Sequence, residues 1–155
     1  MESDIRLYNA GTDMDQWEKA AVMQFLYAHG MGISYQAARN AVDCVLKHTP
    51  SFGGFILADW AGPRLRALVM VNRTGMSGFG PDNLISFAVV HEEEELPVSM
   101  FLLERLIRQA INLSDGEIAF HLPKKHPAIK LFQQLGFQQE YVELRFSCPL
   151  NKVSA

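Results

Sequence analysis

The chain has 155 residues, of which 48% are hydrophobic and 20% charged, and its formal net charge at pH 7 is −3. This length suits a single domain over residues 1–155 with one core, and the negative charge excludes extended nucleic-acid binding, which needs a basic face. No apolar run approaches the ~20 residues of a membrane-spanning helix, and the N-terminus lacks a secretory pattern, so we expect a cytoplasmic protein that binds no membrane. Cys44 and Cys148 are isolated, so no metal site is expected.

The first third of the chain predicts one strand and two helices. Residues 5–8 alternate apolar and polar side chains, as a half-buried strand does. Thr12 can cap a following helix that ends at Gly30, and apolar side chains recur along it at helical spacing. Ser34 can cap a second helix, which Pro50 prevents from continuing.

The middle of the chain predicts strands. Residues 52–59 and 64–73 flank the turn sequence WAGP and together indicate an antiparallel hairpin. A turn-rich loop over residues 74–83 leads to residues 84–90, which are apolar almost throughout. Such a run suits a central strand that is buried on both faces.

A helix, a strand, a short helix and a final extended segment complete the predicted order. Residues 100–113 have an inward leucine stripe and an outward charged face, which is typical of an amphipathic helix. Residues 117–122 read as a strand, and residues 126–136 read as a short helix that ends at a glycine. We expect residues 137–148 to form one strand or a hairpin.

The segment HPAIKLFQQLGF, residues 126–137, carries the sharpest pattern in the chain. In the GNAT acetyltransferase superfamily the corresponding segment commonly reads Asn-x-Ala-x-x-x-Tyr-x-x-x-Gly-Phe, and Ala128, Gly136 and Phe137 stand at matching positions here. With this motif and the order of elements, the whole chain resembles that superfamily. The resemblance implies an α+β (α/β/α) fold, with a mixed, mostly antiparallel central sheet of six to seven strands and helices on both faces.

The resemblance also implies a cofactor site between the fourth and fifth strands. In the family these strands splay apart, the pantetheine arm of acetyl-CoA lies in the gap, and a glycine-rich loop at the start of the next helix holds the pyrophosphate. Lys124, Lys125 and Lys130 could meet the 3′-phosphate of CoA. The cofactor-binding residues implied for this chain are Phe87, Ala88, Val89, Val90, Leu96, Pro97, Val98, Ser99, Lys124 and Phe132.

The phosphate loop departs from the family's pattern, because HEEEELPVS at residues 91–99 contains neither glycine nor arginine. Glycines let the backbone approach phosphates, and the unpaired N–H groups of a first helical turn donate to an anion. Consecutive glutamates would repel pyrophosphate by ~1 kcal/mol for each exposed charge pair. The acidic run has a second interpretation, since carboxylates also interact favourably with a helix N-terminus.

Three side chains are candidates for acid and base chemistry. An amine must lose a proton before it attacks a thioester, and His91 or Glu92 at the mouth of the gap could accept that proton. His126 occupies the family's asparagine position and could contact the cofactor or serve only as a helix cap. Phe132 stands where family members often carry a tyrosine that protonates the departing thiolate, and phenylalanine has no proton to give.

Two main function hypotheses follow. The first is a GNAT-like N-acetyltransferase that transfers an acetyl group from acetyl-CoA to a small-molecule or peptide amine by direct attack, without a metal. The second is a catalytically degenerate GNAT-fold binding or interaction protein, because loop glycines, loop arginine and motif tyrosine are all missing. A weaker third is an acyl-CoA binder in which the lysines replace the loop. The oligomeric state, including a homodimer, stays open.

Overall fold

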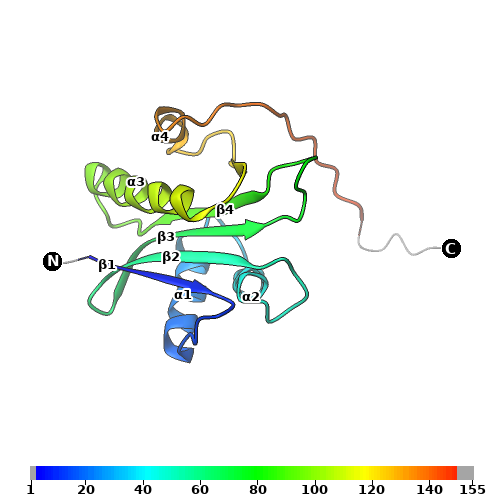
Figure 1. Cartoon of the computed structure of the whole chain (residues 1–155). Coiled ribbons are helices and arrows are strands. Elements are labelled where there is room, and N and C mark those ends of the chain that lie inside the picture. Colours follow the sequence, from blue (N-terminus) through cyan, green and yellow to red (C-terminus); the bar gives the residue numbers. More distant parts are fainter. Residues whose placement is uncertain (1–2, 150–155) are drawn as a thin grey trace.

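The computed structural model describes residues 3–149, which form a five-stranded sheet in the order β1-β2-β3-β4-β5 (Figure 1). The first four strands pair antiparallel with their neighbours, and β5 pairs parallel with β4. The mixed, mostly antiparallel sheet is confirmed, but the described residues form five strands rather than six or seven. The strands are β1 (Asp4–Asn9), β2 (Gly54–Ala61), β3 (Arg64–Arg73), β4 (Asn83–Val90) and β5 (Ile118–Phe120).

Helices cover both faces of this sheet (Figure 1). Side chains of a strand point alternately to opposite faces, and β2 and β3 therefore supply two core clusters. Ile56 and Leu68 pack with the first two helices, whereas Leu57 and Val69 pack with the last two. The predicted α/β/α layering is confirmed. One layer contains α1 (Gln16–His29) and α2 (Tyr35–Val45), and the other contains α3 (Leu96–Leu113) and α4 (Ile129–Gln134).

The two N-terminal helices begin at side-chain caps. Asp15, rather than the predicted Thr12, caps α1, and its carboxylate accepts a hydrogen bond of 2.6 Å from the Trp17 N–H. The hydroxyl oxygen of Thr12 instead accepts from the backbone N–H of Asn9 at 3.0 Å and closes the turn after β1. Ser34 caps α2 through its side-chain oxygen, as predicted.

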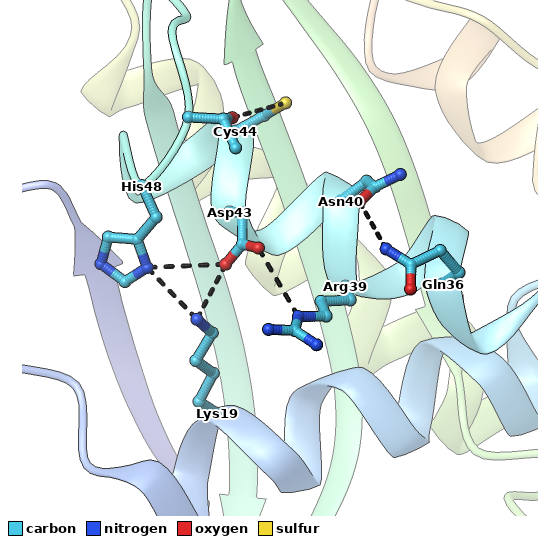
Figure 2. A network of polar contacts seen from close by, with 8 residues as sticks. Lys19, Gln36, Arg39, Asn40, Asp43, Cys44 and His48 are labelled. Carbon is cyan, nitrogen blue, oxygen red and sulfur yellow. Dashed lines mark hydrogen bonds and ion pairs between the residues drawn. The ribbon is translucent and has the colours of Figure 1, made fainter.

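A polar network joins α1 to α2 (Figure 2). The Nζ of Lys19 on α1 donates to a carboxylate oxygen of Asp43 on α2 at 2.8 Å. His48 Nδ1 lies 3.5 Å from the same oxygen, and Arg39 Nε lies 3.9 Å from the other one. Partial burial acts to raise the pKa of Asp43, but the hydrogen bond from Lys19 and the charges around it outweigh burial and lower the pKa.

We expect Asp43→Asn to lower the free energy of unfolding by about 1 kcal/mol at pH 7, because the ion pair with Lys19 is lost. A carboxylate with a lowered folded-state pKa stabilises the protein above its unfolded-state pKa, and this contribution disappears as the pH falls through the folded value. Urea unfolding curves of both proteins should therefore begin to converge as the pH falls below about 4, and should coincide only below the lowered folded-state pKa of Asp43. A difference in unfolding free energy that does not shrink as the pH falls further would show that the stabilisation does not come from the ionised Asp43 carboxylate.

A bulge interrupts the pairing of β3 with β4. Met70 pairs with Phe87 and Val71 pairs with Ile85, so Ser86 is an extra residue in β4. Because the bulge absorbs it, Phe87 still packs toward α1 and α2, and Ile85 still packs toward α3 and α4. Each layer thus keeps its apolar contacts on both sides of the bulge.

Two predicted boundaries are wrong. The helix expected from residue 100 begins at Leu96, since Pro97 is accepted in a first turn, where its missing N–H has no helical partner. The strand or hairpin expected over residues 137–148 is absent from the described structure, where this segment is extended and unpaired. Among residues 3–149, no helix has the length and apolarity that crossing a membrane requires.

Candidate functional site

A gap opens between β4 and β5. The two strands pair only at Asn83 with Ile118, and at the next two positions up to Ile85 with Phe120. Beyond Ile85, residues 86–90 of β4 have no ladder partner on that side within residues 3–149. Backbone N–H and C=O groups need partners, so this edge can bind an extended ligand. The ladder thus ends along the part of β4 where the family resemblance places the splay.

His126 lies at this gap. Its ring is hydrogen-bonded to the backbone of Ala88 and makes an edge contact with Phe120 at 5.9 Å between ring centroids. His126 Nδ1 accepts from the backbone N–H of Ala128 at 3.1 Å, so the neutral ring carries its proton on Nε2. Burial lowers the pKa of His126, and the Ala88 hydrogen bond opposes this only in part. The residue is therefore both a cap of the turn before α4 and a neutral N–H donor at β4.

A groove of about 380 Å³ lies between the N-terminal half of α3 and the short helix α4. It adjoins the gap, because His126 contacts β4 and the next residue, Pro127, lines the groove. Its walls are largely apolar, and they carry one cation, Lys130, and one carboxylate, Glu104. Ligand sites commonly have this size and this mixture of apolar walls with a few polar groups. The lining residues are Pro97, Met100, Phe101, Glu104, Pro127, Lys130, Leu131 and Gln134.

The acidic loop folds against β3. The Glu94 carboxylate lies 3.2 Å from Arg66 Nε and 3.5 Å from Arg64 Nη2, and its side chain is only 12% exposed. Glu93 lies 3.8 Å from the same Arg64 nitrogen. Glu92 and Glu95 are exposed and form no ion pair with the described residues. Two of the four glutamates are thus partly neutralised, and two are available to a ligand or to water.

The start of α3 offers fewer donors than a glycine-rich loop would. Glu95 is the N-cap residue, and its side chain makes no capping hydrogen bond. Pro97 in the first turn has no N–H. The Ser99 hydroxyl donates to the Leu96 carbonyl at 2.8 Å, and Ser99 itself is buried. Leu96 and Val98 are exposed, so their backbone can be approached from solvent.

His91 stands beside a second histidine. The rings of His91 and His29, the last residue of α1, lie 4.2 Å apart between centroids, and Phe25 packs against both. His91 Nδ1 accepts from the Glu93 N–H at 3.2 Å. Burial, and then the neighbouring His91, lower the pKa of His29. His29 Nδ1 is buried and has no hydrogen-bond partner among residues 3–149. Sequence reasoning missed His29, since nothing local relates it to a residue 62 positions away.

The remaining predicted site residues differ in how far their side chains are exposed to solvent. Phe132 is buried in the core and stacks on Phe120 at 4.1 Å, so its side chain faces apolar neighbours. The side chains of Ala88 and Val89 are also buried, which leaves only their backbone for a ligand. Phe87 and Val90 are partly buried, and Lys124 is exposed. No hydrogen bond or ring contact joins His91 to His126 within residues 3–149.

The carboxyl group of Asp59 is buried near Arg66, the arginine that pairs with Glu94 of the acidic loop. Asp59 on β2 is fully buried, and its nearest cation is Arg105 on α3, with Nη1 3.8 Å from one oxygen. Burial raises the pKa of Asp59. No group of three or more metal-ligating side chains is present among the residues that the structure describes.

Known proteins resemble this chain in structure but not in sequence. No protein-family model matches the chain, and no curated protein matches it. A GNAT family acetyltransferase from Staphylococcus aureus matches with a TM-score of 0.61 at 13% identity, over 96% of this chain and 100% of that chain. An aminoglycoside N-acetyltransferase in complex with CoA matches with a TM-score of 0.64 at 15% identity, over 95% and 96%. A transcriptional regulator from Bacillus halodurans matches with a TM-score of 0.64 at 14% identity, over 94% and 100%.

These identities bear on the fold alone. The first two matches are acetyltransferases, and the five-stranded, mostly antiparallel sheet between two helical layers has the arrangement that the motif at residues 126–137 implied. The chain has the fold of the GNAT acetyltransferase superfamily.

Proposed function

We propose that this protein is an N-acetyltransferase that transfers an acetyl group from acetyl-CoA to an amine. The observation that carries the proposal is the unpaired edge of β4 over residues 86–90, which adjoins the groove between α3 and α4. The pantetheine arm, an extended chain with two amides, would bond to this edge. The nucleotide would lie in the groove, where Lys130 is available to a phosphate and the exposed Lys124 precedes α4.

The chemistry needs no metal and no covalent enzyme intermediate. The free amine attacks the thioester carbonyl carbon, a C–N bond forms, and the C–S bond breaks to release the CoA thiolate. One proton leaves the amine, and one proton joins the thiolate. His91, or Glu92 beside it, is the proposed base for the first proton. His29 lies beside this base, with 4.2 Å between the two ring centroids, and Phe25 packs against both rings.

His126 has a different role in this proposal. Its pKa is lowered, so the ring is neutral near pH 7 and is a poor source of a proton. Its Nε2–H is engaged by the backbone of Ala88, so the ring holds the unpaired part of β4 in place for the cofactor. We therefore assign His126 to cofactor positioning. Phe132 is buried in the core and has no proton to give, so in this proposal the CoA thiolate takes its proton from solvent.

The acceptor is a cationic amine in this proposal. Glu92 and Glu95 are exposed beside the candidate base and would attract a small-molecule or peptide ammonium group. Cys44 and Cys148 are free thiols, which suits a reducing compartment, and we propose a cytoplasmic location on that ground.

We expect His91→Gln to lower kcat/KM for acetyl transfer about a hundredfold or more while acetyl-CoA binding stays the same, because a general base contributes that much. Calorimetry with acetyl-CoA measures binding, and release of free thiol with a panel of amines measures transfer. His48→Gln, at a partly exposed histidine of the α1–α2 network, is the control. No binding at millimolar acetyl-CoA would exclude the cofactor, and unchanged transfer by His91→Gln and Glu92→Gln would exclude both bases.

A second candidate function is a binding module without catalysis. It is favoured by the first turn of α3, where Glu95 is the cap, Pro97 removes a donor and no glycine is present. Acetyl-CoA binding with no acetyl transfer to any amine of the panel would support this alternative against the enzyme.

A further inference from the structure

A second pocket lies at the end of the sheet where β4 begins. It has a volume of about 420 Å³, within the ~300–1,000 Å³ that is usual for small-molecule sites. The ladder pairs Asn83 with Ile118 at this end, whereas the gap opens beyond Ile85, towards the other end of β4. The pocket and the groove between α3 and α4 share no lining residue. It is therefore a separate cavity that the proposed acetyl transfer does not use.

One wall of this pocket is built by close packing. Phe52 precedes β2, and its ring lies so near Gly75 that a Cβ at residue 75 would be 2.5 Å from the ring. Gly75 also has a φ of +74°, in the left-handed region that favours glycine. Thr74 holds the same loop: its hydroxyl oxygen accepts from the Met76 N–H at 3.1 Å, and its own N–H donates to the Asp82 carbonyl at 3.0 Å. The wall thus keeps its shape through contacts of its own.

The pocket has apolar surface at its floor and at its rim. Phe55 on β2 is buried and forms the floor. Phe52 and Leu113, the last residue of α3, are 64% and 43% exposed and form opposite parts of the rim. Because exposing apolar surface to water is unfavourable, a ligand with an apolar group would be stabilised by covering these side chains.

A buried amide supplies a fixed acceptor. Asn83 lines the pocket and is only 4% exposed. Its side-chain nitrogen donates to the backbone carbonyl of Asp115 at 2.7 Å and lies 3.4 Å from that of Glu117. These two acceptors fix which end of the amide carries the nitrogen, and Oδ1 accepts no hydrogen bond within residues 3–149. An amide oxygen shielded from water is costly without a donor, so an N–H group of a ligand would stabilise it.

Two side chains of opposite charge line the pocket without contacting each other. Arg73 ends β3 and Asp115 follows α3, and neither side chain forms an ion pair or hydrogen bond within residues 3–149. The other carboxylate, Asp82, accepts from the Glu117 N–H at 2.8 Å and so serves the fold. The last turn of α3 has no basic residue, which leaves the negative end of the helix dipole without a cation. The pocket therefore offers one cation and one anionic corner.

We propose that this pocket binds a free amino acid with an apolar side chain, as a second site apart from the gap beside β4. The ligand's carboxylate would pair with Arg73, whose planar fork matches a carboxylate through two hydrogen bonds. Its ammonium group would lie between Asp115 and Asn83 Oδ1, next to the end of α3. Its side chain would cover Phe52 and Leu113. A ligand with only one charge would leave Arg73 or Asp115 unpaired. The proposal does not rest on acetyl transfer.

The first test compares four probes by NMR titration of the labelled native protein. L-Leucine carries both charges, N-acetyl-L-leucine lacks the ammonium group, isopentylamine lacks the carboxylate, and glycine lacks the apolar side chain. L-Leucine should bind at millimolar concentration or below and shift amide signals of residues 74–83 and 113–117. The other three probes should bind about tenfold more weakly, because each loses one of the three interactions. No binding of L-leucine or L-phenylalanine at millimolar concentration would overturn the proposal.

The second test assigns each charge of the ligand to its partner. Arg73→Gln should weaken L-leucine binding about tenfold and leave isopentylamine nearly unchanged, whereas Asp115→Asn should weaken L-leucine to a similar degree and leave N-acetyl-L-leucine nearly unchanged. Arg108→Gln, at another exposed arginine, is the matched control and should change no affinity. Equal weakening of every probe by Arg73→Gln would overturn the assignment. Loss of L-leucine binding in Glu92→Gln with Glu95→Gln would also overturn it, because the ligand would then lie at the acidic loop.

Discussion

Replacing Glu92 and Glu95 with glutamine is expected to tighten acetyl-CoA binding about thirtyfold, because each exposed carboxylate repels the pyrophosphate by ~1 kcal/mol and ~1.4 kcal/mol is a factor of ten. These two glutamates are chosen because they have no ion pair in the described structure, whereas Glu93 and Glu94 are paired with arginines of β3. Calorimetry of the native protein and the double variant measures the change. The gain should shrink as salt is added, since exposed charges are screened.

The control for this prediction removes the same charge elsewhere. Asp13→Asn with Glu117→Gln changes two exposed carboxylates, one before α1 and one at the other end of β4 and β5 from the acidic loop. This pair should leave the affinity within a factor of two or so of the native value, because Asp13 precedes the end of α1 that is remote from His91, Glu117 lies at the start of β4, and exposed charges are screened beyond about 8–10 Å. Equal effects of the two double variants would show that the pyrophosphate does not lie at the start of α3.

The second large effect is expected on stability. Arg66→Met leaves the Glu94 carboxylate with only the more distant Arg64, in a place where the Glu94 side chain is 12% exposed. Breaking a largely buried ion pair by removal of one partner costs about 3 kcal/mol. For a chain of this size that loss lowers the melting temperature by about 6–12 °C. Thermal unfolding followed by circular dichroism measures the change.

Two companion variants make the interpretation specific. Arg66→Met with Glu94→Gln should regain most of the lost stability, because no uncompensated charge is then buried. Arg108→Met removes an exposed pair within α3, whose arginine side chain is 62% exposed, and should cost less than about 0.5 kcal/mol. If the double variant is no more stable than Arg66→Met, the cost comes from lost packing of the arginine stem rather than from the buried charge.

The sequence predicted the fold well wherever the signal is local. Helical periodicity located α1, α2 and α3, and the cap at Ser34 is present. The first turn of α3 was missed because LPVS has neither helical periodicity nor a recognised cap. In the sequence Pro97 indicates a helix break, whereas in the structure it lies in the first turn of the helix. Residues 137–148 have a strand pattern, but a strand also needs an edge to pair with, and alternation along one segment cannot supply that edge.

In the candidate site, too, some features could be predicted from the sequence and others could not. The gap beside residues 86–90 could be anticipated because a motif and an element order imply a fold. The partners of individual side chains could not be anticipated. Glu94 finds Arg66 and Arg64 only because the loop folds against β3, and His91 meets His29 only because α1 ends beside β4. Such contacts depend on three-dimensional packing, which leaves no trace in the spacing of residues.

The bulge at Ser86 affects the alignment of the candidate site without affecting the packing of the two cores, although these two properties usually change together. Deleting its codon would restore regular alternation, so Phe87 and Ala88 would keep their sides of the sheet and both cores could survive. The end of β4 would also stay in register, because Phe87 already pairs with Met70 and Ala88 with Val69. The bend and extra twist that a bulge gives its strand would be lost, and Ala88 would turn relative to His126. In a genetic screen, this lesion should give a folded, abundant protein with a misaligned gap. The bulge thus sets the direction of the end of β4 at the site, and mutations that change residue identity would not reveal it.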